Sequence, residues 1–223
     1  MNADIKLIRS RRRSLALEIT PNATLIVRAP FLFPMWKIKK FVRTKQAWIR
    51  KNQDRILKKQ LRFKPKQYIS GEEFLYLGET CQLKIIDNQA ESLVLEGDFR
   101  LSSQYLDRAD EIFTTWYKEE AENTIKERLE YFSSTSSLKY KAFRISNAKK
   151  RWGSCSIKGS LNFSWRLIMA PVDVIDYVIV HELVHLAEHN HSRKFWQKVA
   201  NIMPDYRKHR KWLRENGNYL YIE

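Results

Sequence analysis

Apolar and polar residues alternate at the start of the chain. The apolar positions of this alternation are Ile5, Leu7, Leu15, Leu17 and Ile19. Pro21 and Asn22 mark a turn, and Leu25–Val27 then resume the apolar pattern. A period of two places alternate side chains on one face of a strand, and a second run after a turn is typical of paired strands. The pattern therefore predicts a β-hairpin over residues 5–29.

After Pro34 the spacing becomes that of a helix. Apolar residues recur at intervals of about 3.6 residues from 35 to 61, and they are Trp36, Phe41, Val42, Trp48, Ile49, Ile56 and Leu57. Lysine and arginine residues occupy the opposite face. The pattern predicts one long amphipathic helix that packs on the adjoining sheet. Because Trp36 and Trp48 fall on the apolar face, we expect them in the core and not as platforms on which nucleic-acid bases stack.

Short apolar runs follow in the middle of the chain, at 74–77, 82–86 and 92–95. Turn-forming residues separate them, namely Gly78, Asp87, Asn88, Gly97 and Asp98. Runs of this length between turn residues are typical of strands. From about 106 to 132 the apolar spacing is again helical, and the serine- and threonine-rich stretch at 133–137 predicts a flexible break.

Strands and helices are both expected in the last third. Residues 142–147 predict a strand, and 151–167 predict a hairpin that turns at Lys158–Gly159. Helices are expected at 172–189, at 193–203 and from 206 onward. The whole pattern predicts an α+β fold. We expect a basic, β-rich region with one long helix at 1–105 and a second domain at 106–223.

The ends of the helix at 172–189 carry capping signals. Pro171 breaks the preceding segment, and Asp173 with Asp176 resembles a capping box. Asn190 is a candidate C-terminus, and Ser192 is a candidate N-cap for the next helix. A tight corner is therefore expected between the two helices.

Composition indicates a folded protein. Hydrophobic residues make up 43% and aromatic residues 13% of the 223-residue chain, which is enough for a substantial core. No apolar run approaches the length of a membrane span, and the start lacks the pattern of a secretory leader. The two cysteines, Cys81 and Cys155, form no C-x-x-C motif. We therefore expect a cytoplasmic protein with reduced cysteines and no membrane partner.

Positive charge is concentrated near the N-terminus. Residues 1–70 hold 19 Lys and Arg against 3 Asp and Glu, whereas residues 71–223 hold 22 of each kind. The whole net charge of +16 therefore comes from the first third. Such segregation is consistent with a surface for nucleic acid or phosphates, and equally with a solvated, solubilising face.

The sequence His181-Glu182-Leu183-Val184-His185 carries the clearest chemistry. Residues four apart lie on the same side of a helix, so both imidazoles can bind one metal ion. Glu182 follows the first ligand, where it can act as general base toward a metal-bound water. This spacing predicts a zinc site on the helix.

A third histidine follows at the interval found in extended H-E-x-x-H motifs. His191 lies ten residues after His181, although Glu188 occupies the position at which such motifs usually carry glycine. Three protein ligands leave a fourth position open for water and substrate. His189 is a nearby competitor that we expect on the surface, and a carboxylate elsewhere remains an alternative third ligand. We expect His209 to be structural or exposed.

Other motifs accompany the histidines. They are Arg151–Ser156, Leu161–Leu167, Pro171, Asp176–Val178, His191-Ser192 and Phe195-Trp196. Together with the H-E-L-V-H sequence, they make the chain similar to the YgjP-like family of predicted zinc hydrolases, which is classed with zincin metallopeptidases and related to SprT-like domains. The resemblance implies a zincin-like domain with His181, His185 and His191 as ligands of one zinc ion and Glu182 as the catalytic residue. It does not identify the substrate, because fold does not determine function.

Three functions remain open. In a metallopeptidase, zinc lowers the pKa of its bound water and Glu182 accepts the proton. In a nucleoside triphosphate (pyro)phosphohydrolase, the same nucleophile attacks phosphorus and the basic N-terminal third holds the nucleotide. In a nucleic-acid-associated zincin, the basic third recruits the enzyme to protein bound on DNA. The H-E-x-x-H motif favours the metallopeptidase, with a peptide or protein as substrate.

Several residues outside the motif are candidates for assisting catalysis. Arg151 and Arg166 are candidates for stabilising an oxyanion or a phosphoryl oxygen, and each is equally suited to a structural ion pair. Tyr206 is a candidate oxyanion donor, although an exposed tyrosine at a helix end is the commoner case. In a zincin, a strand such as those expected within 151–167 flanks the cleft and can pair with an extended peptide.

Overall fold

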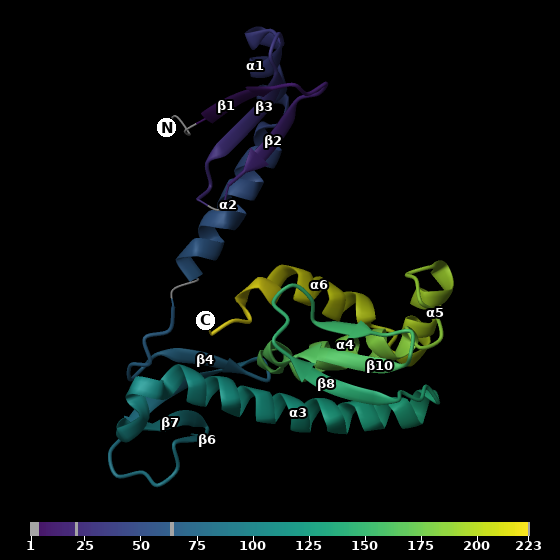
Figure 1. Cartoon of the computed structure of the whole chain (residues 1–223). Coiled ribbons are helices and arrows are strands. Elements are labelled where there is room, and N and C mark those ends of the chain that lie inside the picture. The colour runs from purple at the N-terminus through teal and green to yellow at the C-terminus, as the bar shows by residue number, and fades with distance from the viewer. Residues whose placement is uncertain (1–4, 21, 63–64, 223) are drawn as a thin grey trace. The chain divides into compact units, whose positions relative to one another are not determined.

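The computed structural model describes residues 5–20, 22–62 and 65–222, and it divides into two compact units, Met1–Lys64 and Pro65–Glu223 (Figure 1). The boundary that we expected at 105–106 is not where the structure divides. The strands that follow Pro65 share one core with the helices of the C-terminal half, as the burial of Phe74 and Leu83 beside Phe113 shows. These strands therefore belong to the second unit.

A three-stranded sheet opens the N-terminal unit. Its strands are β1 (Ile5–Ser10), β2 (Ala16–Ile19) and β3 (Leu25–Pro30), in the order β1-β3-β2. β2 and β3 form the antiparallel part of the expected hairpin, whereas β1 pairs in parallel with the other edge of β3. The simple hairpin that we predicted over 5–29 is therefore a larger sheet. Val27 is its centre, since both Leu7 and Leu17 are in register with it.

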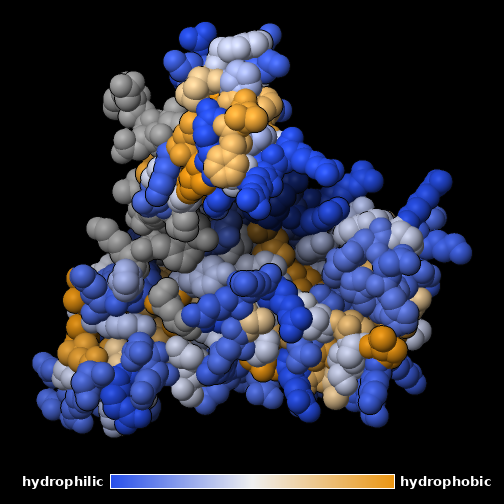
Figure 2. Space-filling model, turned by 45° about the horizontal axis from the view of Figure 1, so that its top comes forward, coloured by the Kyte–Doolittle hydropathy of each residue, from blue (hydrophilic) through white to orange (hydrophobic). Residues whose placement is uncertain are grey.

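Two helices, not one, follow the sheet. They are α1 (Met35–Thr44) and α2 (Gln46–Arg62), separated at Lys45. Ile38 and Ile49 are buried against the sheet. Trp36 and Trp48 are 63% and 45% exposed, so their predicted place in the core is wrong. The break at Lys45 separates the two apolar stripes, and the small sheet covers the isoleucines but not the tryptophans. In Figure 2, hydrophobic residues (orange) lie at the surface among hydrophilic residues (blue).

The second unit begins with a four-stranded sheet. The strands β4 (Glu73–Tyr76), β5 (Glu79–Ile86), β6 (Leu93–Glu96) and β7 (Asp98–Ser102) lie in the order β4-β5-β7-β6. The first three match the predicted runs, while β7 was not predicted. Its residues Phe99 and Leu101 are fully buried, and β7 pairs in parallel with β5. A 3-10 turn, η1 (Ser103–Arg108), then leads into the next helix.

The long helix α3 (Ala109–Ser136) runs the length of this unit (Figure 1). It continues through the serine- and threonine-rich stretch, where we expected a break. The hydroxyls of Ser134 and Thr135 donate to the carbonyl of Tyr131, and that of Ser136 donates to the carbonyl of Phe132. Because these bonds return to carbonyls of the same helix, the stretch is compatible with helical structure. The helix ends at Ser137, which is left-handed with φ 59°.

A second sheet carries the hairpin predicted over 151–167. Its strands are β8 (Ala142–Ser146), β9 (Gly153–Cys155) and β10 (Ser160–Ser164), in the order β8-β10-β9. β9 is antiparallel to β10 and forms an edge of the sheet. The turn contains Gly159 with φ 80°, a conformation that favours glycine. The hairpin prediction and its turn at Lys158–Gly159 are confirmed.

Helices complete the unit. They are η2 (Trp165–Met169), α4 (Val172–Val184), α5 (Arg193–Ile202), α6 (Tyr206–Asn216) and η3 (Gly217–Tyr219). α4 contacts α3, α5, α6 and β9, and almost every residue from Val174 to Val184 is buried. It is therefore a central helix with no wide polar face. None of the described helices combines the length and the apolar character that a membrane crossing requires.

The predicted capping box at the start of α4 is wrong. The N-cap is Pro171, and no side chain caps this end. Asp176 is buried and accepts hydrogen bonds from Nε and Nη2 of Arg128 on α3, at 2.7 and 2.5 Å. A buried carboxylate is stable only with a charged or hydrogen-bonding partner, so this ion pair joins α3 to α4.

Candidate metal centre

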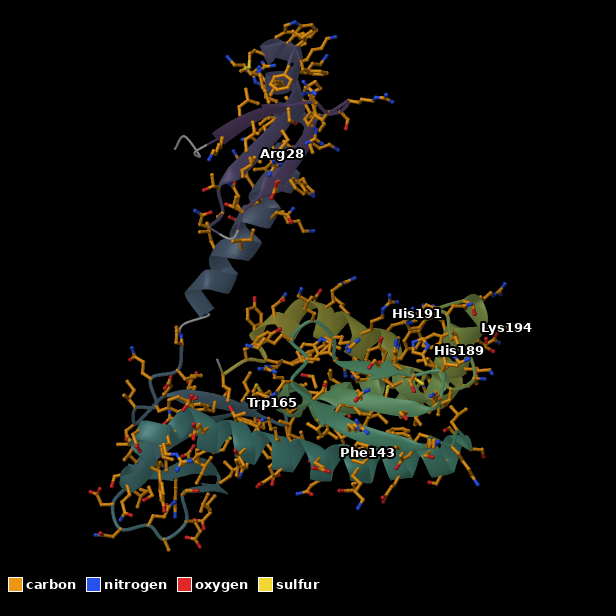
Figure 3. All side chains as sticks on the ribbon, in the orientation of Figure 1. Arg28, Phe143, Trp165, His189, His191 and Lys194 are labelled. Atoms are coloured by element: carbon orange, nitrogen blue, oxygen red, sulfur yellow. The ribbon has the colours of Figure 1, made fainter. Side chains whose placement is uncertain are left out.

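The two histidines of α4 lie at its C-terminal end. His181 is in the last turn, and His185 is the C-cap, so the helix ends at Val184, five residues earlier than the 189 that we predicted. The chain then turns through residues 186–192 before α5 begins. His191 comes from this corner, and Figure 3 shows it with His189 and Lys194 near the junction of α4 and α5. A buried helix therefore fixes two imidazoles, and the corner brings the third toward them.

The three imidazoles converge through the same ring nitrogen. Nε2 of His191 lies 3.0 Å from Nε2 of His181 and 3.2 Å from Nε2 of His185. Tetrahedral zinc with Zn–N bonds of 2.0–2.1 Å separates its ligand nitrogens by about 3.3 Å. Among the described residues, these three side chains form the group whose ligand atoms can share one metal ion. The spacing and the chemistry of the donors therefore fit zinc.

The hydrogen bond of His185 indicates which of its ring nitrogens can bind a metal ion. Its Nδ1 lies 3.0 Å from the backbone carbonyl of Glu188. A carbonyl only accepts, so Nδ1 carries the proton, and Nε2 of the neutral ring presents a lone pair. Fixing the tautomer through a backbone carbonyl is typical of histidine ligands in metal sites.

The environment of His181 favours its neutral form. Burial, the neighbouring His185 and His191, and Arg210 together lower the pKa of His181 to about 3. Burial and the charges of His185 and Arg210 also lower the pKa of His191. Nδ1 of His181 is buried and has no hydrogen-bond partner among the described residues. Because metals bind neutral imidazole, this environment prepares the ring for a metal and not for a proton.

Aromatic rings of α5 hold the histidines in place. The ring of Phe195 lies within 4.9 Å, centroid to centroid, of each of the three imidazoles. Trp196 stacks on His191 at 5.6 Å. The Phe195 amide donates to Oγ of Ser192, which confirms the predicted N-cap and starts α5 two residues after His191. The cap therefore sets the positions of both rings relative to the histidines.

Glu182 is 6% exposed and lies beside the histidines in the same hollow. Burial raises its pKa to about 7, although the positive charge of Arg151 opposes the shift. Gly153 of β9 lies against it, since a Cβ at that position would come within 2.5 Å of Oε1 of Glu182. Only glycine fits there without displacing the carboxylate. We did not predict this requirement, and its signal in the sequence was a glycine within a strand pattern.

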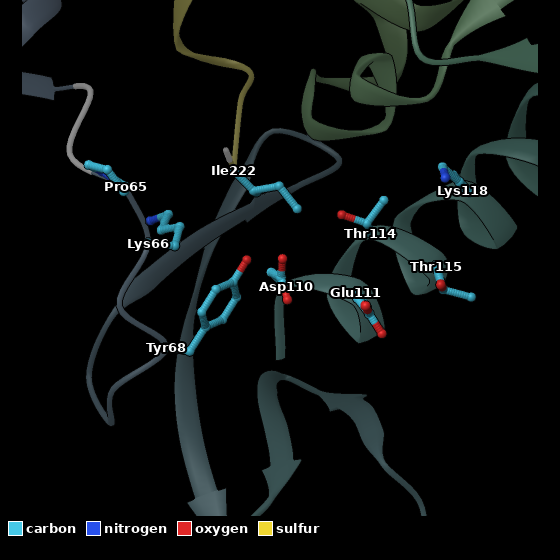
Figure 4. Close-up of a pocket in the computed structure, with 9 residues that line it drawn as sticks. All are labelled: Pro65, Lys66, Tyr68, Asp110, Glu111, Thr114, Thr115, Lys118 and Ile222. Atoms are coloured by element: carbon cyan, nitrogen blue, oxygen red, sulfur yellow. The ribbon is translucent and has the colours of Figure 1, made fainter. Parts of the chain in front are cut away.

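The hollow has a volume of about 520 Å³ and opens beside β9. Its lining consists of Gly153, Ser154, Cys155, Ile157, His181, Glu182, His185, His189 and His191. His189 is exposed, as expected, but it also borders the hollow. Another hollow, of about 620 Å³, lies between Pro65–Tyr68 and the start of α3 (Figure 4). It contains Lys66, Asp110, Glu111 and Lys118 but no histidine.

Two of the residues that we considered for assisting catalysis, Arg166 and Tyr206, contact other residues outside the hollow of the histidines. Arg166 is 1% exposed, stacks over Trp165 at 4.3 Å and donates to the carbonyl of Asn147. Tyr206 is buried and stacks on Trp196 at 5.4 Å, which excludes the exposed position that we considered commoner. Neither residue lines the hollow of the histidines. Both contacts support the structural alternative for these residues.

His209 and Arg151, the remaining predicted residues, differ in their position relative to the metal centre. His209 is buried and bonded through Nε2 to a carboxylate oxygen of Asp205 at 2.8 Å, in agreement with a structural role. Arg151 is exposed and lies near enough to Glu182 to influence its pKa. Of the assisting candidates, Arg151 is therefore the one whose charge acts at the site.

One family model and two solved structures are similar to this chain. A family model described as "YgjP-like, metallopeptidase domain" matches residues 13–216. The metallopeptidase zymogen of Pyrococcus abyssi abylysin is 20% identical and covers 41% of this chain and 93% of its own, with a TM-score of 0.38. The zymogen of Methanocaldococcus jannaschii jannalysin is 18% identical and covers 41% and 95%, with a TM-score of 0.37. No curated protein matches the chain.

Proposed function

We propose that this chain, which belongs to the YgjP-like metallopeptidase family, cleaves peptide bonds at a zinc centre held by His181, His185 and His191, with Glu182 as general base. The observation that carries the proposal is the convergence of three Nε2 atoms beside a buried carboxylate. Family membership supports a metal-dependent hydrolase. The zinc ion, the ligand set and the peptide substrate are our proposal.

The reaction divides its tasks between the ion and the chain. Zinc, when bound by the three imidazoles, supplies a Lewis acid that acidifies water and polarises a carbonyl group. Glu182 accepts a proton from the attacking water and returns it to the departing amine. Gly153 keeps the carboxylate in place through its close contact. The position of Arg151 allows its positive charge to stabilise the ionised form of Glu182.

The edge strand beside the site supports a peptide as substrate. The Ser164 amide donates to the Trp152 carbonyl, and the Ser156 amide donates to the Ser160 carbonyl, both at 2.8 Å. In an antiparallel pair the bonded residues alternate, so Gly153 and Cys155 direct their backbone groups away from β10. An extended peptide can pair with these groups as an added strand. Its carbonyls would then lie along the hollow that contains Glu182.

The test compares zinc-loaded protein with its Glu182→Gln variant on an unfolded protein and on a panel of nucleoside triphosphates. We expect peptide fragments from the native protein and a loss of about 10²–10⁴-fold in turnover in the variant, as for removal of a general base. Glu188→Gln is the matched control, because Glu188 forms an ion pair with Lys198 and takes no part in the proposed proton transfer.

Two results would contradict the proposal. Unchanged peptide cleavage by Glu182→Gln would exclude Glu182 as the base. Hydrolysis of triphosphates alone, lost in the same variant, would replace the peptidase with a phosphohydrolase. The nucleic-acid-associated alternative requires DNA binding that weakens steeply with salt, and salt-independent affinity would exclude it.

A further inference from the structure

A second concentration of positive charge lies beside the metal centre. The second unit as a whole is nearly neutral, with 23 Lys and Arg against 22 Asp and Glu in residues 65–223. Within it, residues 193–214 hold eight Lys and Arg and one acidic residue, Asp205. Asp205 already accepts a hydrogen bond from His209. The positive charge of α5 and α6 is therefore uncompensated within this segment.

These cations surround a hollow of about 770 Å³. The charged residues that line it are Arg193, Arg207, Arg210, Lys211 and Arg214. Trp196 and Tyr206 provide its aromatic wall. Within the described parts of the chain, no carboxylate forms an ion pair with Arg193, Arg207, Arg210 or Lys211, and Arg214 has only a 3.8 Å contact with Glu215. Clustered cations without counter-charges create a strong local potential that attracts anions.

Stacked rings connect this hollow to the metal centre. The ring centroid of Trp196 lies 5.6 Å from that of His191 and 5.4 Å from that of Tyr206. The guanidinium of Arg210 lies over the same indole at 4.4 Å. A stacked guanidinium keeps its N–H groups available at its edge, where they match a carboxylate in bidentate geometry. About three residues of an extended peptide are long enough to reach from His191 to Arg210.

We propose that this cationic hollow is a substrate subsite that binds acidic side chains of a peptide within about three residues of the cleaved bond. The proposal rests on the peptidase function and adds a preference for acidic sequences. A carboxylate pairs with Arg210 and Arg193 while the neighbouring peptide backbone lies beside β9.

Binding tests the subsite without turnover. The full-length Glu182→Gln protein, loaded with zinc, is titrated with tetraglutamate and tetraglutamine, and tryptophan fluorescence and calorimetry report the affinity. We expect tetraglutamate to bind at least about tenfold more tightly, as for one charge-assisted hydrogen bond gained, and to weaken as salt rises. In the Arg193→Gln/Arg210→Gln double variant this difference disappears. Lys208→Gln, on α6 but outside the hollow, retains it.

Cleavage gives a second measurement. Paired peptides carry Glu or Gln at each of the three positions on either side of the cleaved bond. We expect kcat/KM of the native protein to favour the Glu member of at least one pair, by about tenfold. In the Arg193→Gln/Arg210→Gln variant we expect both members of each pair to be cleaved with the same kcat/KM. Lys208→Gln, on α6 but outside the hollow, keeps the preference for the Glu member.

These experiments distinguish failure of the proposed subsite from failure of the proposed peptidase function. Equal binding of tetraglutamate and tetraglutamine overturns the subsite, even if neutral peptides are cleaved. Binding of inorganic pyrophosphate but not of tetraglutamate overturns the acidic-peptide assignment in favour of a phosphate site. If tetraglutamate binds as expected but no peptide is cleaved, the peptidase function fails and the anion site remains.

Discussion

The two units of the chain use the same residue types in opposite ways. Among the described residues of the N-terminal unit, the buried core consists of Leu25, Val27, Ala29, Ile38 and Ile49, and Trp36 and Trp48 remain exposed. In the C-terminal unit, Trp165 is completely buried within a core that spans both sheets and α3 to α6. The burial of a tryptophan therefore depends on how much apolar surface faces it.

Charge separates the units in the same way. Residues 1–64 hold 18 Lys and Arg against 3 Asp and Glu, and the ion pair between Arg28 and Glu18 lies at the surface. In the C-terminal unit, Arg128 and Asp176 form a largely buried pair that joins α3 to the metal-binding helix. The larger unit thus uses charge to fix its framework, whereas the smaller unit presents charge to solvent.

We expect the largest difference in the free energy of unfolding between two tryptophan variants, one from each unit. Trp165→Ala removes a buried ring that stacks on Tyr117 and donates from Nε1 to Asn147, so we expect a loss of about 3–5 kcal/mol in the free energy of unfolding. Trp36→Ala should change it by no more than about 0.5 kcal/mol, because the ring is exposed. Chemical denaturation of each full-length variant measures both. A large loss in Trp36→Ala would remove the contrast between the units.

Ion pairs provide the next comparison. Arg128→Met leaves the carboxylate of Asp176 buried without its partner, and we expect a loss of about 3 kcal/mol. Arg28→Met should cost less than about 1 kcal/mol, since Arg28 and Glu18 are 40% and 51% exposed. Thermal denaturation at low and high salt distinguishes the two, because salt screens the surface pair more strongly. Equal losses would show that burial does not decide the strength of these pairs.

A single methyl group tests the support of Glu182. Gly153→Ala places a Cβ within 2.5 Å of Oε1 of Glu182, so the carboxylate must move. We expect turnover to fall about 100-fold, as for a catalytic group displaced by about 1 Å, while zinc content stays unchanged. Ser160→Ala is the control, because Ser160 lies on β10 of the same sheet and does not line the hollow. Full activity in Gly153→Ala would show that the contact is not needed.

The smallest effect concerns the corner that carries His191. Ser192→Ala removes the N-cap of α5 and should lower the free energy of unfolding by about 1 kcal/mol. Because α5 starts beside His191, zinc affinity should fall as well, and competition with a chelating dye measures this change. Ser134→Ala, within α3, is the control that should leave both unchanged. Unaltered zinc affinity in Ser192→Ala would separate the cap from the site.

Local patterns were sufficient to predict much of the C-terminal unit. The i, i+4 spacing placed His181 and His185 on one helix, and turn residues located the hairpin at Lys158–Gly159. The N-cap at Ser192 was also predicted, since capping depends on neighbouring residues. Each of these features depends on residues that are close together in the sequence, so a local pattern is enough to predict it.

The remaining features depend on contacts between distant segments. Asp176 was interpreted as a local cap, but it pairs with Arg128, 48 residues away. The contact of Gly153 with Glu182 requires β9 to approach α4. Trp36 is exposed because of how much surface the small sheet offers. No periodicity in the sequence contains this information.

The most direct test of the account is the zinc content of purified variants after loading and exhaustive dialysis, measured by elemental analysis. We propose that His181, His185 and His191 bind one zinc ion. We expect one ion per chain in the native protein, in His189→Ala and in Glu182→Gln, and almost none in alanine variants of the three histidines that remain folded by circular dichroism. Full zinc occupancy in any of those three, or its loss in His189→Ala, would contradict the account.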